Sequence, residues 1–392
     1  MISYIIPTRD RHDTLHETLG SLSRLGPHDA EVIIADNASH EPVRVPATLD
    51  SGVSVRVLRL DGNLGAAARN HVAEIASGEW LVMLDDDSSP DNLGFIEVLR
   101  AAEPDVHAVA AEIHLPHQNG RAIREHGGLP EVFIGCGVAI RTDDYRRLGG
   151  YDASFGYYAE EYDLAARMLL AGGRIALDRR FRVTHRKVSQ SRDFSRIVSN
   201  LVRNNAWVAR RYWPSNTGWN TEAWRHITRY ARIARKEHAI AGYARGLFDL
   251  ATTWFDQPTT PMPQSLWDRF TGLHAARKAL AHEIATRGPL GQVAIVAPGK
   301  NEWAVRQALD ELGIASNAAP DHADTLVVGT LSPGPMLDAF DAWTLRHPRV
   351  VMPWLVDDAG CAIDSDQPSN TTPNFRHDPD RTLLAPQIRI SA

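Results

Sequence analysis

The stretch WLVMLDDDSSPDNLGFIEVLRAA, residues 80–102, decides the fold. It opens with an apolar run typical of a buried strand, continues with the carboxylates Asp85, Asp86 and Asp87, and ends in a helical pattern. A strand, a polar loop and a helix form the repeating unit of α/β sheets. The negative charge at the strand end is the feature that any function must explain.

The preceding residues repeat the same alternation. Strands are predicted at residues 2–7, 31–39 and 53–60, and helices at residues 13–26 and 66–78. In the first of these helices, Thr14 and Glu17 have the spacing of a capping box. One face of that helix carries Leu15, Leu19, Leu22 and Leu25. Strands separated by helices of this length predict a parallel sheet with crossover helices on its faces.

Composition limits the class of protein. With 392 residues the chain exceeds the usual size of one domain, so two or three domains are expected. A hydrophobic share of 43% and a charged share of 23% are ordinary for a folded protein. The net charge of −6 argues against a sequence-independent nucleic-acid binder, so no nucleic-acid partner is predicted.

Cysteine usage and hydropathy indicate the compartment. Cys136 and Cys361 lie far apart and give neither a disulfide framework nor a zinc-like spacing, which favours a reducing environment. The apolar run at the N-terminus is too short for a signal peptide, and no later run approaches a membrane span. We expect a cytosolic protein, and peripheral attachment to the inner membrane face stays open.

Polar residues gather where the predicted strands end. Pro7, Thr8 and Arg9 end the first strand, Asp36 the second, and the three aspartates the strand at residue 80. Ligands of such sheets bind beyond the carboxyl ends of the strands. Carboxylates suit Mg²⁺ or Mn²⁺, which usually bind together with substrate phosphates, so a metal-bridged diphosphate is the natural ligand. The alternative is that residues 85–90 form a solvated turn that caps the next helix.

Two common nucleotide sites are not supported. No GxGxxG follows the first strand, which argues against a nicotinamide or flavin site. No GxxxxGK[ST] is present, which argues against a P-loop.

Five motifs, in order and spacing, resemble the nucleotide-sugar-dependent glycosyltransferases of family 2, which have the GT-A fold. The motifs are YIIPTRDR (4–11), VIIADNAS (32–39), NLGAAARN (63–70), WLVMLDDDSSPD (80–91) and GGYDASFGYYAEEYDLAARMLLAGGRIAL (149–177). The resemblance covers roughly the first half of the chain, and five ordered motifs are more specific than any one of them.

The resemblance implies roles for the strand-end residues. Pro7, Thr8, Arg9, Asp36, Arg69, Asp85 and Asp86 would bind the nucleotide sugar, with Asp36 on the base or ribose. Asp87 is the expected direct metal ligand, and His185 is expected to touch the metal or the diphosphate. For Arg69 the alternative is an ordinary arginine on a helix surface.

A second chemical centre is expected at the start of a helix. Glu160 and Glu161 precede an apolar face formed by Leu164, Met168 and Leu169, and Gly172 and Gly173 end the helix. The resemblance implies that one carboxylate is the general base of an inverting displacement. The family commonly writes Glu-Asp-x-Asp where this chain has Glu-Glu-Tyr-Asp. Matching the register of this motif to that of the family selects Glu161 as the base. Glu160 is left for acceptor binding or for structure.

Three further residues are expected on the acceptor side. Gly135 and Gly137 fall where the family approaches donor and acceptor with backbone, and the alternative is a strand bulge or close packing. Asp163 belongs to the glutamate motif, but it stands four residues before Arg167, so an ordinary helical ion pair is the alternative.

The sequence pattern changes after about residue 210, which predicts three parts of the chain. We predict a GT-A domain at 1–210, a helical segment at 211–288 and a small Rossmann-like α/β module with an irregular tail at 289–392. Residues 255–265 contain three prolines and are predicted to be a loop. The Arg-, Tyr- and Trp-rich helices are expected to pack on the catalytic domain, with a membrane surface bearing a lipid-linked acceptor as the alternative. The tail from Asp357 is expected to be loosely ordered.

The predicted fold class is therefore α/β, a GT-A mixed sheet flanked by helices. The predicted function is transfer of a sugar from a UDP- or dTDP-sugar to a hydroxyl of a glycan, a lipid-linked acceptor or a small molecule, in polysaccharide or glycoconjugate assembly. Mn²⁺ or Mg²⁺ is the expected cofactor. The alternatives are a sugar-1-phosphate nucleotidyltransferase, which needs a glycine-rich basic loop that residues 6–13 lack, and a sugar-nucleotide-binding protein without catalysis. The sequence does not determine the sugar, the linkage or the oligomeric state.

Overall fold

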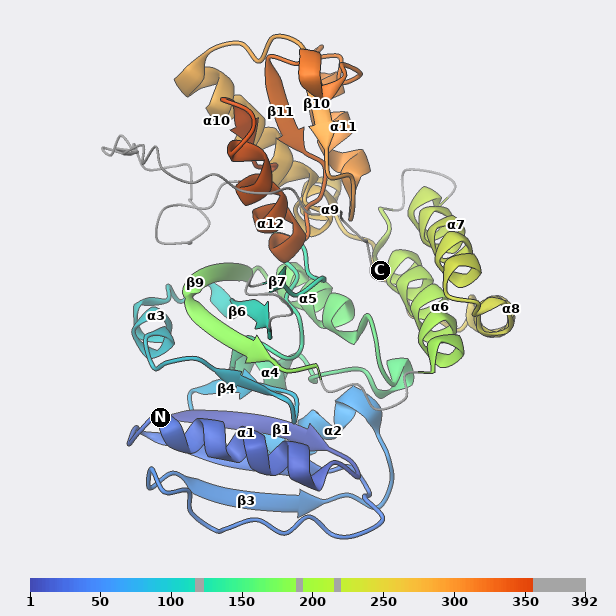
Figure 1. The fold of residues 1–392 in the computed structure, drawn as a ribbon. Coiled ribbons are helices and arrows are strands. Elements are labelled where there is room, and N and C mark those ends of the chain that lie inside the picture. Colours follow the sequence, from blue (N-terminus) through green and yellow to red (C-terminus); the bar gives the residue numbers. More distant parts are fainter. Residues whose placement is uncertain (117–122, 188–192, 215–219, 355–392) are drawn as a thin grey trace.

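The computed structural model describes residues 1–116, 123–187, 193–214 and 220–354. These residues contain a nine-stranded sheet and a three-stranded sheet (Figure 1). The large sheet has the order β3-β2-β1-β4-β8-β6-β9-β5, with β7 paired to β6. Its strands are β1 (Ile2–Thr8), β2 (Ala30–Asp36), β3 (Ser54–Arg59), β4 (Trp80–Met83), β5 (Ser88–Pro90), β6 (Val106–Leu115), β7 (Ile123–Arg124), β8 (Val138–Arg141) and β9 (Arg174–His185).

The sheet is mixed, as the predicted fold class requires. β1 pairs in parallel with β2 and β4, and β2 pairs in parallel with β3, which confirms the parallel sheet predicted from the N-terminal alternation. Beyond β4 the direction changes, because β8 is antiparallel to both β4 and β6. The carboxyl ends of β1, β2 and β4 lie at one edge, and the predicted strand-end residues lie there.

Helices cover both faces of the sheet. The even residues of β1, among them Tyr4 and Ile6, pack with α1 (His12–Arg24) and α3 (Phe95–Ala101), whereas Ile5 belongs to the opposite core with α2 (Ala68–Glu74) and α5 (Glu160–Leu170). The short helix α4 (Thr142–Arg147) follows β8. The predicted leucine face of α1 is confirmed for the buried Leu15, Leu19 and Leu22, whereas Leu25 is the C-cap residue just past the helix. The predicted capping box is wrong, because the helix begins at His12 and its N-cap, Arg11, makes no side-chain cap bond.

Residues 88–90 form strand β5 and not a helix-capping turn. Ser88–Pro90 pairs antiparallel with β9, in the register Ser88 to His185 and Pro90 to Val183. Helix α3 begins only at Phe95. The alternative of a solvated cap for DDDSSP is therefore wrong, and the pairing brings His185 beside the aspartates.

Past β9 the chain forms helices and then the small sheet (Figure 1). The helices are α6 (Phe194–Tyr212), α7 (Thr221–Lys236), α8 (Ile240–Thr253), α9 (Gln264–Thr271) and α10 (Leu273–Arg287). The predicted loop at 255–265 is confirmed for most of its length, since α8 ends at Thr253 and α9 begins at Gln264. Within the described residues, no helix is both long and apolar enough to cross a bilayer.

The last described residues alternate strand and helix as predicted. β10 (Val293–Val296), β11 (Thr325–Val328) and β12 (Val350–Val351) form a parallel sheet, with α11 (Glu302–Glu311) and α12 (Pro333–Thr344) between them. One continuous apolar core joins this unit to α5, α9 and α10. The division at residues 210 and 288 and the cytosolic location stay predictions, and the tail from Asp357 lies outside the described residues.

Candidate active site

Asp85 lies directly after β4 and is the accessible member of the aspartate run. Its side chain is 40% exposed, and its Oδ1 accepts a hydrogen bond of 2.5 Å from Arg69. Arg69 is 4% exposed and also donates to the Leu84 carbonyl, so the alternative of a surface arginine is wrong. Burial alone would lower the pKa of Arg69, but the charge of Asp85 raises it, so the guanidinium stays charged. The Asp85–Arg69 pair therefore places one accessible carboxylate and one buried guanidinium group after the end of β4.

Asp86 is buried and held by β1 and the loop after it. Thr8 donates to its Oδ2 at 2.7 Å and Arg11 contacts its Oδ1 at 2.5 Å. Burial raises the pKa of Asp86 to about 6, although Arg11 and Thr8 oppose the shift. Both carboxylate oxygens have protein partners, so the geometry favours a structural task for Asp86.

Asp87 lies between the side chains of Arg11 and His185. Its Oδ2 is 2.8 Å from Arg11, and its Oδ1 is 3.2 Å from Nε2 of His185. Burial works against ionisation, but the hydrogen bonds and charges of His185 and Arg11 outweigh it and hold the pKa of Asp87 below its usual range. Asp87 is therefore a carboxylate at any neutral pH.

The ring of His185 bridges two acids. Besides the contact with Asp87, its Nδ1 is 2.9 Å from Oε2 of Glu125 and 3.6 Å from the sulfur of Cys136. Burial alone would lower the pKa of His185, but contacts with Cys136, Asp87 and Glu125 raise it above its ordinary value. Glu125 is 7% exposed and its other oxygen is 2.9 Å from Lys187. A carboxylate on the far nitrogen is the arrangement that orients a histidine toward a metal.

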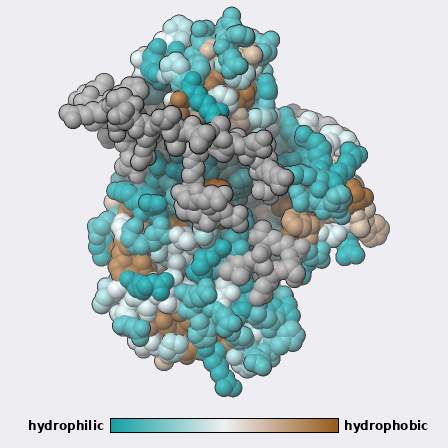
Figure 2. Space-filling view, viewed as in Figure 1, coloured by the Kyte–Doolittle hydropathy of each residue, from teal (hydrophilic) through white to brown (hydrophobic). Residues whose placement is uncertain are grey.

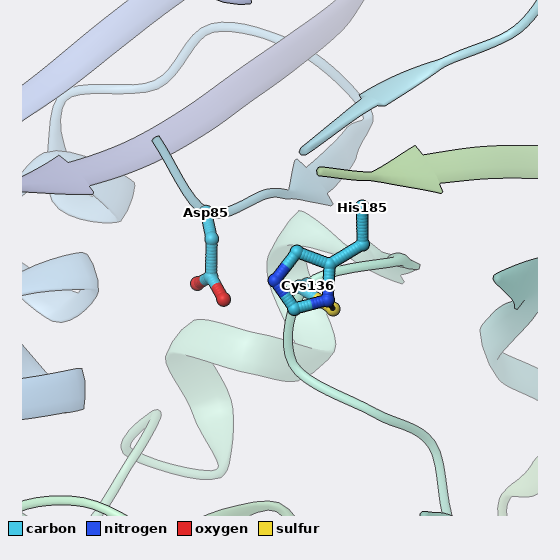
Figure 3. Close-up of side chains that lie close together, drawn as sticks. All are labelled: Asp85, Cys136 and His185. Atoms are coloured by element: carbon cyan, nitrogen blue, oxygen red, sulfur yellow. Dashed lines mark hydrogen bonds between the residues drawn. The ribbon is translucent and has the colours of Figure 1, made fainter. Parts of the chain in front are cut away.

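The donor atoms around His185 fit a divalent cation. One ligand atom each from Asp85, Cys136 and His185 lies within 4.8 Å of the others. Figure 3 shows the Asp85 carboxylate and the His185 ring on either side of one gap, with the sulfur of Cys136 beside the ring. Burial raises the pKa of Cys136 to about 11, so this thiol is protonated at neutral pH and is a poor ligand. The carboxylates and the imidazole are the groups that suit Mn²⁺ or Mg²⁺.

Glu160 and Glu161 begin α5, where acids are favoured by the helix dipole. The turn before them is strained, with φ of 75° at Tyr158 and 67° at Ala159. Asn204 of α6 holds this turn, because its amide donates to the carbonyls of Phe155, Tyr157 and Tyr158 at 2.6–3.0 Å.

The two glutamates differ in their contacts. Glu161 is half-buried and accepts a hydrogen bond of 3.4 Å from the backbone N–H of Gly135. Glu160 is 6% exposed, and no described residue donates to its Oε2. Burial raises the pKa of both groups, and the charge of Glu161 adds to the shift at Glu160. A carboxyl group with a raised pKa is suited to accept a proton near neutral pH.

The two predicted glycines have different surroundings. A Cβ on Gly135 would lie 3.3 Å from Oε1 of Glu161, so the missing side chain lets the backbone approach the carboxylate. Gly137 is buried, and a Cβ there would lie 2.8 Å from Ile113, which matches the close-packing alternative. The structure therefore brings Gly135, and not Gly137, to the glutamates.

Asp163 is 1% exposed and is held by three donors. Arg167 and Arg211 each donate to its carboxylate at 2.9 Å, and the hydroxyl of Tyr212 donates at 2.7 Å. The predicted alternative of an ion pair with Arg167 is confirmed. These contacts join α5 to α6 and favour a structural task over acceptor contact.

Asp163→Asn is expected to lower the free energy of unfolding by about 3 kcal/mol, because it leaves buried guanidinium groups short of a charge partner. Urea unfolding measures the loss. The matched control is Asp105→Asn, which breaks an exposed pair with Arg174 and should cost under about 1 kcal/mol. Unchanged stability together with lost transfer would instead place Asp163 at the acceptor.

The remaining predicted nucleotide residues lie at the ends of β1 and β2. Asp36 is fully buried and accepts from the N–H groups of Ser39 and Val43 and from Arg59, so its carboxylate closes the turn after β2. Pro7 is buried within β1, and the exposed Arg9 pairs with Asp10 at 3.6 Å. The structure brings Arg11, which the sequence analysis did not select, to the aspartates in place of Arg9.

Residues 3–148 match the model of Glycosyl transferase family 2, so this part of the chain is similar to that family. An uncharacterized glycosyltransferase of Haemophilus influenzae is 39% identical over 88 residues, which cover 22% of this chain and 29% of that protein. The O-antigen biosynthesis protein RfbC of Myxococcus xanthus is 26% identical over 227 residues, 49% of this chain and 18% of that protein. The chain thus spans less than a third of either relative's length.

A relative named for amylovoran biosynthesis and a solved structure match further parts of the chain. The amylovoran biosynthesis glycosyltransferase AmsB of Erwinia amylovora is 23% identical over 158 residues, 36% of this chain and 52% of that protein. The crystal structure of GalNAc-T7 with UDP, GalNAc and Mn²⁺ aligns over 75% of this chain and 60% of that chain. Its TM-score is 0.46 at 17% identity.

Proposed function

We propose that this protein is an inverting glycosyltransferase that moves a sugar from a nucleoside diphosphate sugar to an acceptor hydroxyl. One observation carries the proposal: the segment Gly135–Cys136 touches both chemical centres. The N–H of Gly135 donates to Glu161, and the sulfur of Cys136 lies against His185, which contacts Asp87. A base and a group of diphosphate-binding side chains therefore share one wall, as a displacement at an anomeric carbon requires.

The residues divide the work of the reaction. Glu161 accepts the proton of the acceptor hydroxyl while that oxygen forms a bond to the anomeric carbon. The bond from that carbon to the diphosphate oxygen breaks in the same step, so the configuration inverts. Arg69 and Arg11 hold Asp85 and Asp87 in place at the leaving-group side. Asp87, His185 and Asp85 would hold Mn²⁺ or Mg²⁺, which neutralises charge on the leaving diphosphate when bound.

The donor and acceptor are proposed as classes. A UDP- or dTDP-sugar is the proposed donor, as the family resemblance implies, and Pro7, Thr8, Arg9 and Asp36 are the proposed nucleotide side. RfbC and AmsB are named for O-antigen and amylovoran biosynthesis, which supports a polysaccharide or glycoconjugate acceptor.

A thermal-shift panel tests the proposal on the full chain. Nucleoside diphosphates and nucleotide sugars are each added with Mn²⁺ and with EDTA, and a ligand that binds only the folded state raises the melting temperature. One nucleotide should give a shift that EDTA removes, followed by release of that nucleoside diphosphate during turnover. No shift with any nucleotide would overturn the proposal.

Glu125→Gln is expected to weaken Mn²⁺ binding by about 10- to 100-fold, because a neutral amide orients His185 less firmly than a carboxylate. Titration of free Mn²⁺ followed by electron paramagnetic resonance measures the affinity without turnover. The matched control is Glu131→Gln, which lies in the same segment but pairs with Arg269 of α9. Equal Mn²⁺ affinity in Glu125→Gln and wild type would show that Glu125 does not position the ligand.

A further inference from the structure

Helix α8 packs against the protein through its smallest residues. Its buried residues are Gly242, Gly246 and Leu250. A Cβ on Gly242 would lie 2.0 Å from the Ser195 carbonyl oxygen, and one on Gly246 would lie 2.4 Å from Val202. The two glycines therefore allow α8 to lie very close to α6, and few large apolar side chains of α8 are buried there.

The opposite face of α8 is apolar and exposed. Ile240, Ala244, Phe248 and Ala251 are all exposed, and at about 100° per residue they fall within one arc of about 80°. Ile240 is 51% exposed and Phe248 is 69% exposed, and Phe255, in the turn after the helix, is 84% exposed. Figure 2 shows a brown patch on the right of the molecule, where Figure 1 places α8. A gathered patch of this kind marks an interaction surface more often than scattered apolar residues do.

The charges around this face are mainly positive. Between residues 220 and 256, all of which the structure describes, the exposed basic residues are Arg225, Arg232, Arg235, Lys236 and Arg245, against the exposed acid Asp256. Arg225 does not count toward this face, because it pairs with Glu222 at 2.9 Å and lies over the ring of Trp303. The other acids of this segment are paired with basic side chains: Glu222 with Arg225, Glu237 with Lys236 at 3.9 Å, and Asp249 with Arg203 at 4.0 Å. The exposed charge of the face therefore comes from Arg232, Arg235 and Arg245. This surface is basic although the whole chain carries a net charge of −6.

This charge pattern distinguishes between two occupants of the face. In a symmetric dimer the same patch meets itself, so Arg232, Arg235 and Arg245 would approach their own copies. Such like-charge contact opposes association. An anionic lipid surface, by contrast, attracts the arginines and accepts the aromatic side chains at its boundary.

We propose that the outer face of α8 docks on an anionic lipid bilayer. The docking face consists of Ile240, Ala244, Phe248, Ala251 and Phe255, together with the exposed Arg245 of α8 and with Arg232 and Arg235 in the last turns of α7, which packs against α8. Ile240, Phe248 and Phe255 enter the headgroup boundary while the guanidinium groups contact lipid phosphates. Docking would depend on this surface alone and not on the proposed reaction.

Vesicle co-sedimentation of the full chain tests the docking face. The probes are vesicles of phosphatidylcholine alone and vesicles with about one third phosphatidylglycerol, at low and high salt. Wild type should bind the anionic vesicles and lose affinity with salt. Phe248→Ser with Phe255→Ser should weaken binding by about tenfold or more. Arg232→Gln, Arg235→Gln and Arg245→Gln should each weaken vesicle binding by about fivefold.

The matched control is Leu345→Ser, because Leu345 is 72% exposed but lies after α12 in the small C-terminal sheet unit. Its binding should equal that of wild type, and all variants should unfold at similar temperatures since the changed groups are exposed. Absence of vesicle binding by wild type would overturn the proposal. Light scattering supplies a second readout: a dimer that Phe248→Ser with Phe255→Ser dissociates would make the face a self-interface and also overturn it.

Discussion

Glu161→Gln is expected to lower the turnover of glycosyl transfer by about 10²- to 10⁴-fold, the usual contribution of a general base. The amide has the shape of the carboxylate and can still accept the hydrogen bond from the N–H of Gly135. It cannot accept a proton from the acceptor hydroxyl. The metal-dependent thermal shift with the nucleotide should stay close to that of wild type, because Asp85, Asp87 and His185 are unchanged. Full transfer by this variant would contradict the assignment of the base.

Glu160→Gln is the matched comparison for that experiment, since the two residues are neighbours of the same type. Transfer that survives in Glu160→Gln and fails in Glu161→Gln assigns the base to Glu161, and the reverse result assigns it to Glu160. The pH profile gives a second readout. Burial raises the pKa of Glu161, and the base acts only when deprotonated, so the acidic limb of the wild-type rate should lie above the ordinary glutamate pKa. The residual rate of Glu161→Gln should lack that limb.

The elements that position the site could be predicted because each is set by local pattern. The apolar strands at residues 2–7 and 80–84, the leucine face of α1 and the helix after Glu160 depend on periodicity within a few turns of chain. The alternation of these elements then places their polar ends at one edge of the sheet. Asp85, Asp87, His185 and Glu161 could be selected for that reason.

The contacts around these residues depend on tertiary register and could not be predicted in the same way. Glu125 stands 60 residues before His185 and reaches it because β7, which it follows, pairs with β6, and β6 pairs with β9. Asn204 supports the turn before Glu160 from another helix. Arg11 was available as the next basic residue after Arg9, but the choice between them required the direction of each side chain. The capping box failed for a similar reason, since α1 begins two residues before Thr14.

Asp87→Ala is expected to abolish the metal-dependent thermal shift that wild type shows with its nucleotide. Asp87 is the acid that contacts both His185 and Arg11, so its loss removes one proposed cation ligand and the partner of another. A ligand at 100 times its dissociation constant stabilises a folded protein by about 2.7 kcal/mol, and that increment should disappear. The same measurement on Asp91→Asn is the control. Asp91 is close in sequence, but its carboxylate accepts from Thr184 and lies 3.8 Å from Arg182, so the shift should persist.

The comparison must use the shift and not the melting temperature itself, because removal of Asp87 also leaves Arg11 and His185 with fewer partners. Asp87→Asn provides the test at constant shape, since its amide fills the space but carries no charge. If both Asp87 variants lose the shift and Glu161→Gln keeps it, cation binding depends on Asp87 and proton transfer on Glu161. The two tasks would then belong to different side chains on either side of the Gly135–Cys136 segment. If both Asp87 variants keep the shift, Asp85 and His185 would be assigned as the cation ligands, because they supply the remaining accessible carboxylate and imidazole. Asp85→Asn would then be the variant that loses the shift.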